Sequence, residues 1–500
     1  MQKKVIIIGA GLAGLAAGCY AQMNGYSSEI YEHFAIPGGL AATWVKNGFL
    51  ITTSIQALAG YNNESPFYKL YSELGIIKYN KFIPTEKGHL HIDEINDKRI
   101  EITSDLNKWI NDFKNAYPED ADMTDTILNG AKNLSEIDIK ELLIQKSKGE
   151  NSAINRFIKI LNIPQGGKDI KFLKTSLSEF AKNFRNPVLR KSFMVLVNPS
   201  GSVFAFLNSM GLFKDIKLGL IEGGVYELVD SIEKRYRKLG GKITPQSQVS
   251  KILVKNNKVT GIRLAAGTVV ECDNVISAGD GRNTIYNLLE GKYMSKNIKK
   301  MYETWTVCRP CIIFNYGIKK EYPDAFYNNL IFLKHPINAG ISEIKNINLR
   351  IYNYSQKFSP KGSTLFQARV ETDWDYWTNL KIIDPNLYNS ELERICREIL
   401  ASINKHFPGT ASNVELTDIM PSFTLWERTL NYKGSPMGWY YTGDPEVPFI
   451  EKKIPGLDGF YMAGHWVTSG GQALSTLYSG KEAVELLCRD DKKDFITSLP

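Results

Sequence analysis

Three glycines near the start of the chain have the spacing that binds phosphate groups. The segment Gly9-Ala10-Gly11-Leu12-Ala13-Gly14 reads G-x-G-x-x-G. In such a segment the first glycine makes a tight turn, the second lets the backbone approach a pyrophosphate, and the third lets a helix pack closely on a strand. The free N–H groups and the dipole of that helix favour the anionic phosphates. We therefore expect these six residues to bind a dinucleotide.

The elements around the glycines have the order that such a site needs. The β-branched run 5–8 predicts a buried strand, and Leu12, Leu15 and Ala16 repeat at helical spacing. A second strand over 28–32 ends in Glu32, which lies 18 residues after Gly14. A carboxylate at about this spacing binds a ribose hydroxyl. Glu32 and the adjacent His33 are therefore predicted to contact the cofactor.

A second glycine doublet follows in Pro37-Gly38-Gly39-Leu40. This order resembles the FAD-dependent amine oxidase and phytoene desaturase superfamily, in which the doublet usually reads Gly-Gly-Arg. Leu40 stands where arginine is usual, so the basic contact of the family is missing from this position. The resemblance implies FAD as the cofactor, with Gly38, Gly39, Leu40 and Ile55 beside it.

Two further segments match the FAD motifs of this superfamily. A meander over 248–270 and a strand over 275–280 return the chain to the FAD domain, and the resemblance places Val249 near the adenine and Gly279 near the pyrophosphate. Near the C-terminus a strand runs into Gly464 and His465, and a glycine loop and a helix follow. His465 occupies the usual acidic position, so we expect its charge to change near neutral pH and to shift the flavin potential. The other contacts implied in this motif are Gly471, Gln472, Ala473 and Leu474.

The segment 420–439 most resembles the phytoene desaturase branch, which includes carotenoid isomerases and retinol saturases. A Pro-x-Thr stretch, an arginine and a Gly-Ser pair lie close to the flavin in that branch. Glu427 and Arg428 are the candidate catalytic residues on this basis. The alternative for this pair is an ion pair in solvent.

The length of 500 residues predicts two domains. We expect an α/β fold in which a discontinuous, Rossmann-like FAD-binding domain comprises residues 1–105, 222–300 and 440–500. An inserted α+β substrate domain comprises residues 106–221 and 301–439. The resemblance covers the inserted domain only in its general layout.

The implied activity is that of an FAD-dependent oxidoreductase of the desaturase, saturase or isomerase type. Hydride transfer at flavin N5 would act on a lipophilic substrate, either a polyene or an isoprenoid. One alternative is a flavin amine oxidase, in which Trp439, Tyr440 and Tyr441 would enclose the amine. Another is a non-catalytic FAD-binding scaffold.

Composition narrows the choice of partners and compartment. The net charge of +8 does not indicate a nucleic-acid partner, although a mildly basic surface suits peripheral contact with a membrane. Six cysteines favour a reducing, cytoplasmic location. Cys308-Arg309-Pro310-Cys311 is interpreted as part of a core strand rather than a redox pair, and no metal site is expected because His89 and His91 lack a third ligand. The sequence does not specify the oligomeric state.

Overall fold

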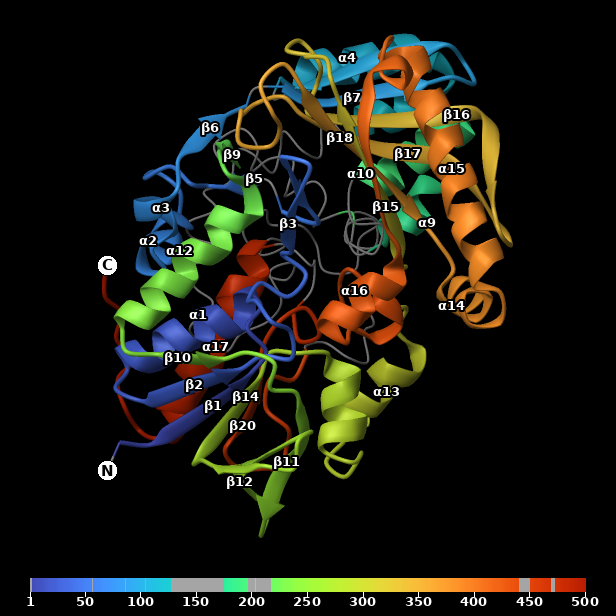
Figure 1. Ribbon diagram of the computed structural model, residues 1–500. Helices are drawn as coiled ribbons and strands as arrows, with labels where there is room; N and C mark the ends of the chain where they lie inside the picture. Colours follow the sequence, from blue (N-terminus) through green and yellow to red (C-terminus); the bar gives the residue numbers. More distant parts are fainter. Residues whose placement is uncertain are drawn as a thin grey trace.

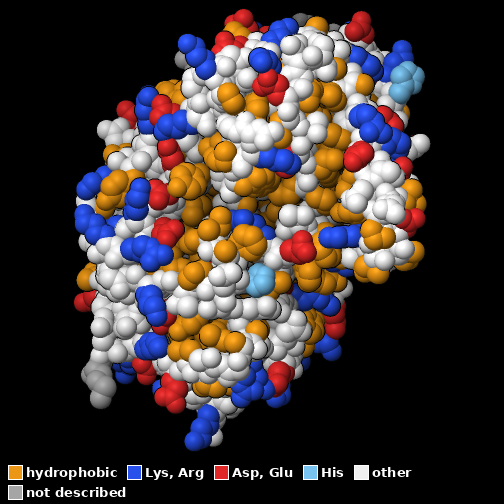
Figure 2. All heavy atoms as spheres, viewed as in Figure 1, with side chains coloured by type: hydrophobic (Ala, Val, Ile, Leu, Met, Phe, Trp, Pro, Cys, Tyr) orange, Lys and Arg blue, Asp and Glu red, His pale blue; other side chains and the backbone are white. Residues whose placement is uncertain are grey.

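The computed structural model describes residues 2–55, 57–85, 87–103, 105–126, 175–196, 203, 217–439, 450–468 and 473–500. Figure 1 shows two halves, each built around a sheet. The sheet of the lower half is parallel, and that of the upper half has seven strands. On the face shown in Figure 2, hydrophobic side chains gather in the hollow between these halves. Within the described residues, no helix combines the length and the apolar character that a membrane span requires.

The lower half is built on a five-stranded parallel sheet whose strands come from distant parts of the chain. Its order is β10 (Lys242–Thr244), β2 (Ser27–Tyr31), β1 (Lys4–Ile8), β14 (Asn274–Ser277) and β20 (Phe460–Met462). The expected strands at 5–8, 28–32 and 275–280 are all present, each within a few residues of its expected bounds. The fold is thus α/β with a discontinuous, Rossmann-like domain.

Helices cover one face of the parallel sheet and a meander covers the other. Helix α1 (Leu12–Met23) packs between α12 (Gly224–Lys238) and α17 (Ala473–Asp490), and nearly every residue of α1 is buried. Small residues permit this close packing, because a Cβ on Gly480 would lie 2.4 Å from the carbonyl oxygen of Ala13. On the other face, β11 (Val249–Lys255), β12 (Lys258–Leu264) and β13 (Val269–Glu271) form an antiparallel sheet that shares a core with β14 and β20.

The upper half contains a seven-stranded sheet. Its order is β19 (Val414–Met420), β15 (Cys311–Ile318), β18 (Thr364–Glu371), β17 (Ser342–Tyr352), β16 (Asn328–Ala339), β7 (Lys87–Asp93) and β8 (Lys98–Thr103). All neighbours are antiparallel except β16 and β7, which are parallel. Helices α14 (Trp374–Ile383) and α15 (Pro385–His406) bury their apolar residues against one face.

The other face of this sheet carries a row of polar residues. The strand register places Asn315, Gln367, Arg350, Asn328 and His89 in line across five adjacent strands. Because side chains alternate along a strand, the apolar neighbours of these residues point toward α14 and α15. The polar row therefore faces the N-terminal part of the chain, which includes the hairpin of β3 (Thr43–Lys46) and β4 (Phe49–Thr52).

The sheets suggest one change to the expected domain boundaries. Strands β7 and β8 belong to the seven-stranded sheet, although residues 1–105 were assigned to the FAD-binding domain. We therefore propose that the first segment of that domain ends near residue 86. In the first segment of the expected substrate domain, residues 106–221, the structure describes the helices α4 (Leu106–Ala116), α9 (Leu177–Ala181) and α10 (Pro187–Leu196), and residues 127–174 lie outside the described residues. The remaining helices and strands are β5 (Ala57–Ala59), α2 (Tyr68–Glu73), α3 (Ile76–Tyr79), β6 (Phe82–Pro84), β9 (Leu218–Ile221), α13 (Lys296–Thr304) and α16 (Ser422–Thr429), with short helical turns at Pro118–Asp120, Asn283–Leu288, Ala411–Asn413 and Tyr432–Gly434.

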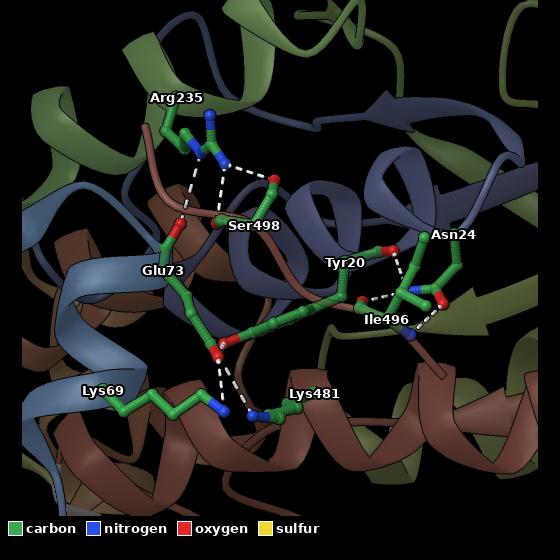
Figure 3. A network of polar contacts seen from close by, with 8 residues as sticks. All are labelled: Tyr20, Asn24, Lys69, Glu73, Arg235, Lys481, Ile496 and Ser498. Carbon is green, nitrogen blue, oxygen red and sulfur yellow. Dashed lines mark hydrogen bonds and ion pairs between the residues drawn. The ribbon is translucent and has the colours of Figure 1, made fainter. Parts of the chain in front are cut away.

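The C-terminal segment is held against the parallel-sheet domain by a buried polar network (Figure 3). The carboxylate of Glu73 accepts a hydrogen bond from the hydroxyl of Tyr20 at 2.7 Å and lies 3.1 Å from Lys481 Nζ. Arg235 Nη2 donates to the backbone carbonyl of Ser498 at 2.8 Å. The carboxylate of Glu73 thus joins α2 to α1 and α17. Arg235 of α12 connects the backbone carbonyl of Glu73 to Ser498 near the end of the chain.

Candidate functional site

The first glycine segment joins β1 to α1. Gly9 has a φ of +96°, which favours glycine, and its N–H donates to the carbonyl oxygen of Tyr31 at 2.8 Å. A Cβ on Gly14 would lie 1.9 Å from the Gly9 carbonyl oxygen, so this position requires close packing. A Cβ on Gly11 would have no atom within 4 Å. Two of the glycines therefore shape the turn, while Gly11 borders open space.

Glu32 holds this turn from the end of β2. Its carboxylate accepts hydrogen bonds from the backbone N–H groups of Ala10 at 2.6 Å and Phe34 at 2.8 Å. The side chain is only 5% exposed, and burial raises the pKa of Glu32 while the two donors act in the opposite direction. The acidic residue is thus adjacent to the glycine turn, as its spacing predicts.

The second glycine doublet lies directly against the first segment. The N–H of Gly38 donates to the carbonyl oxygen of Ala10 at 2.9 Å. Gly39 has a φ of +57°, and a Cβ there would approach Gly11 Cα to 3.4 Å. Both glycine motifs consequently border the same space.

A cavity collects most of the residues that the sequence predicts for the cofactor site. Its lining residues come from the carboxyl ends of the parallel strands and from helix α16. The predicted residues that line it are Gly9, Gly11, Leu12, Ala13, Glu32, His33, Gly38, Gly39, Leu40, Ile55, Val249, Gly279, Arg428, Gly464 and His465.

Other predicted residues do not line this cavity. Ala10 and Gly14 do not line the cavity. The backbone of Ala10 nevertheless stabilises the turn, because its N–H donates to Glu32 and its carbonyl oxygen accepts from Gly38. Ala473 and Leu474 begin α17 and point into its packing. Residues 471–472 lie outside the described residues, so the contacts expected of Gly471 and Gln472 stay predictions.

Arg428 and Glu427 are separated by the geometry of α16. Arg428 lines the cavity, and its Nε donates to the carbonyl oxygen of Gly39 at 3.1 Å. Burial lowers the pKa of Arg428, and nearby Glu32 opposes this effect. The Glu427 side chain is exposed and does not line the cavity, because consecutive helical residues point about 100° apart. This placement removes Glu427 from the candidate site and puts Arg428 beside the glycine doublet.

His465 lies in the cavity but does not have the expected titration. Burial lowers the pKa of His465 to about 4, so its imidazole is neutral near pH 7. The expectation that its charge changes near neutral pH is therefore wrong. Its Nε2 lies 3.4 Å from the hydroxyl of Thr476, at the start of α17.

The cavity also contains residues that the sequence reasoning did not assign. Those with a polar side-chain group are Tyr31, Ser54, Gln248, Asp280, Asn283, Thr429, Asn431, Trp466 and Thr476. Burial raises the pKa of Asp280 to about 6, and its carboxylate accepts hydrogen bonds from the N–H groups of Asn283 and Tyr432. The sequence feature that could have identified Asp280 is its position directly after Gly279, just beyond the carboxyl end of β14.

The residues around this cavity fit a phosphate-bearing dinucleotide. Like Gly11, Gly279 borders open space, since a Cβ there would have no atom within 4 Å. Among the residues described, three buried polar atoms at the cavity have no hydrogen-bond partner, namely Arg428 Nη2, His465 Nδ1 and Trp466 Nε1. Buried polar atoms are normally satisfied, so these atoms indicate a polar ligand.

A second cavity of about 700 Å³ lies against the upper sheet and shares Pro436 with the first. Cys308 and Cys311 line it as buried residues. Cys311 begins β15, as the core-strand interpretation predicts, whereas Cys308 precedes the strand. Within the described residues, no cluster of three or more metal-ligating side chains is present.

Comparisons with known proteins agree with this geometry. The family model for an NAD(P)-binding Rossmann-like domain matches residues 7–74. A 1-hydroxycarotenoid 3,4-desaturase of Flavobacterium sp. (strain P99-3) is 26% identical, and the match covers 97% of this chain and 99% of the relative. A chloroplastic prolycopene isomerase of Daucus carota is 19% identical, covering 95% of this chain and 78% of the relative. The crystal structure of an oxidoreductase from Methanosarcina mazei has a TM-score of 0.59 at 18% identity, covering 96% of this chain and 100% of that one.

These similarities define the class of the protein. The chain is an oxidoreductase with a Rossmann-like dinucleotide-binding domain and a second domain. The expected resemblance to the amine oxidase and phytoene desaturase superfamily is confirmed. Relatives named carotenoid desaturase and prolycopene isomerase are similar to nearly the whole chain.

Proposed function

We propose that this chain is an FAD-dependent oxidoreductase that desaturates, saturates or isomerises a lipophilic polyene or isoprenoid. The observation that carries the proposal is the cavity in which both glycine motifs, Glu32, Gly279 and His465 meet. The relatives named as carotenoid desaturase and prolycopene isomerase match nearly the whole chain, which supports the same substrate class.

The residues of the cavity have distinct tasks in this proposal. The open spaces at Gly11 and Gly279 accept the pyrophosphate, and Glu32 contacts a ribose hydroxyl. Arg428 adds a cation beside the phosphates, and His465 contributes a neutral hydrogen-bonding group. When bound, FAD supplies a hydride acceptor and donor at N5, and the chain supplies orientation and the exclusion of water.

In this proposal the substrate lies between the cofactor cavity and the face of the seven-stranded sheet that carries the polar row. Ile55 lines the cavity directly after Ser54, whose carbonyl oxygen accepts a hydrogen bond from Arg350 of the upper sheet. A ligand held between two domains is the usual arrangement for a cofactor and its substrate.

We also propose a cytoplasmic location with peripheral contact to a membrane surface, where a lipophilic substrate would be found. Three large apolar side chains are exposed around the turn between α14 and α15, namely Ile382 (73%), Ile383 (81%) and Leu387 (46%). Clustered exposed apolar residues typically mark an interaction surface.

The amine oxidase alternative has less support in this chain. Trp439 is buried, donates from Nε1 to the carbonyl oxygen of Trp466 at 3.2 Å and packs against Tyr302 and Trp305. This packing assigns Trp439 to the core, while Tyr440 and Tyr441 lie outside the described residues. Release of hydrogen peroxide with a panel of amines would support the alternative.

The direct test is the cofactor itself. The purified protein should have a flavin absorbance spectrum, and mass spectrometry of the released ligand should give the mass of FAD. A colourless protein that also fails to bind added FAD would overturn the proposal. If the bound flavin is not reduced by any candidate substrate and not reoxidised by any electron acceptor, the result would instead support a non-catalytic scaffold.

A further inference from the structure

Three tyrosines surround an arginine on the inner face of the upper sheet. Arg350 is on β17, and Tyr327, Tyr352 and Tyr354 lie around it. The ring centroid of Tyr327 is 5.7 Å from that of Tyr352 and 5.3 Å from that of Tyr354. We call these four residues the Arg350 cluster.

The charge of Arg350 has no partner of opposite sign in the described part of the chain. Its Nη1 donates to the carbonyl oxygen of Ser54 at 2.7 Å, and no described carboxylate lies within ion-pair distance. A hydrogen bond of this kind does not require a charged donor. The neutral side chain of Gln367 makes a similar one, because its Nε2 donates to the carbonyl oxygen of Thr52 at 2.6 Å. Because burying an uncompensated charge is costly, the guanidinium indicates a function beyond this tie.

The cluster also contains unsatisfied donors. Arg350 Nε and the hydroxyl of Tyr354 are buried atoms with no hydrogen-bond partner among the described residues. Tyr327 and Arg350 each share a side-chain hydrogen bond with Tyr352. Tyr352 differs, because its hydroxyl donates to Gln367 Oε1 at 3.2 Å. Burial raises the pKa of Tyr327 and of Tyr354 well above the ordinary value, so both hydroxyls remain protonated donors.

A group that only accepts hydrogen bonds and carries negative charge would satisfy this set. An ionised carboxylate has two acceptor oxygens and one charge, which balances the single charge of Arg350. A phosphate would bring nearly two negative charges against one cation, so the charge balance favours the carboxylate.

The position of the cluster connects it to the cofactor cavity. Ser54, whose carbonyl oxygen binds Arg350, itself lines that cavity, and Ile55 follows it. The guanidinium is therefore in direct contact with a residue that lines the cofactor cavity.

We propose that the Arg350 cluster binds a carboxylate at one end of the substrate, which is thus a polyene or isoprenoid acid. This inference rests on the proposed function, because it assigns the end group of the same substrate.

The experiment measures binding of matched acids and alcohols to the FAD-loaded protein. Palmitate and hexadecanol share an apolar chain without conjugated double bonds, and retinoic acid and retinol share a polyene. Dissociation constants can be followed by quenching of tryptophan fluorescence. We expect each acid to bind about tenfold or more tightly than its alcohol, in line with a charge-assisted hydrogen bond.

The variants separate charge from folding. Arg350→Gln should remove the preference for the acid and leave the binding of hexadecanol unchanged, whereas Arg350→Lys should keep part of the preference. Tyr354→Phe removes one hydrogen-bond donor and should weaken the binding of palmitate severalfold. This variant tests the site independently if Arg350→Gln does not fold. Arg99→Gln, at an exposed position of β8 in the same sheet, is the matched control and should retain the preference.

Equal affinity of acid and alcohol in the unmodified protein would overturn the carboxylate site, as would a full preference for the acid in Arg350→Gln. The palmitate pair reports on the site alone, because a saturated chain cannot take part in polyene chemistry. A palmitate preference that depends on Arg350, together with no reaction of any polyene, would retain the site and reject the proposed function.

Discussion

Arg428 Nε donates a hydrogen bond to the carbonyl oxygen of Gly39 at 3.1 Å, across 389 residues of sequence. The guanidinium also lies 4.5 Å from the centroid of the Phe34 ring. Leu40, next to Gly39, leaves the second glycine doublet without its usual arginine. Helix α16 therefore brings a cation to the doublet from a distant part of the chain, and we interpret Arg428 as a cofactor-binding residue rather than a catalytic one.

Replacement of Arg428 by alanine should weaken FAD binding. The unpartnered Nη2 can donate to a phosphate, and loss of such a hydrogen bond costs about 2 kcal/mol, or roughly a thirtyfold rise in Kd. Titration of the apoprotein with FAD measures this, with the exposed Arg263→Ala as the control. If Arg428→Ala bound FAD with unchanged affinity but had reduced turnover, Arg428 would act in catalysis and not in cofactor binding.

The Gly11→Val variant should lose FAD and keep its fold. Gly11 has a φ of −70°, which valine adopts, and its side chain would enter space that is open without the cofactor. The free energy of unfolding of the apoprotein should change by no more than about 0.5–1 kcal/mol, as for a surface substitution. Urea unfolding and FAD titration test both parts, with exposed Ala265→Val for comparison. Full flavin occupancy in Gly11→Val would show that the pyrophosphate lies elsewhere.

Buried histidines should make the protein less stable in mild acid. Burial lowers the pKa of His89, His91 and His465 to about 4 each, against about 6.5 in the unfolded chain. Between these values the unfolded chain binds protons that the folded protein does not bind, so stability is lost as pH falls from 6.5 toward 4.

His465→Gln isolates one of these groups. The drop in unfolding free energy between pH 7.5 and pH 5 should be smaller in this variant by about 2 kcal/mol, because glutamine does not titrate. Urea unfolding at the two pH values gives this difference. An equal drop in both proteins would mean that His465 is not buried as a neutral group.

Loss of the Glu73 charge should destabilise the parallel-sheet domain (Figure 3). Glu73→Gln leaves Lys481 without its buried partner, and breaking a buried pair costs about 3 kcal/mol. Lys69→Gln is the matched control, because Lys69 is exposed and its Nζ lies 3.9 Å from the same carboxylate. That change should cost less than about 0.5 kcal/mol. Thermal unfolding that ranks the two variants equally would contradict the importance of the buried pair.

The sequence predicts the parts of this structure that depend on local pattern. The strand, glycine turn, helix and acidic residue from Val5 to Glu32 follow one another along the chain, so spacing alone identifies them. The meander and the last strand are predicted for the same reason.

Other features depend on contacts between distant residues. The pairing of β7 with β16 joins residues more than 200 positions apart, and local composition carries no sign of it. The different directions of Glu427 and Arg428 follow from the placement of α16, and the low pKa of His465 follows from its burial. The Arg350 cluster likewise forms only when β17 meets Ser54.

Anaerobic mixing of the FAD-loaded protein with a lipophilic polyene tests the central claim most directly. The experiment follows the flavin absorbance bands and the double-bond pattern of the recovered polyene, with a panel of amines in parallel. The account predicts that the polyene is desaturated, saturated or isomerised only by protein that contains FAD, and that Gly11→Val abolishes the change. A flavin that amines bleach, while no polyene is altered, would contradict it.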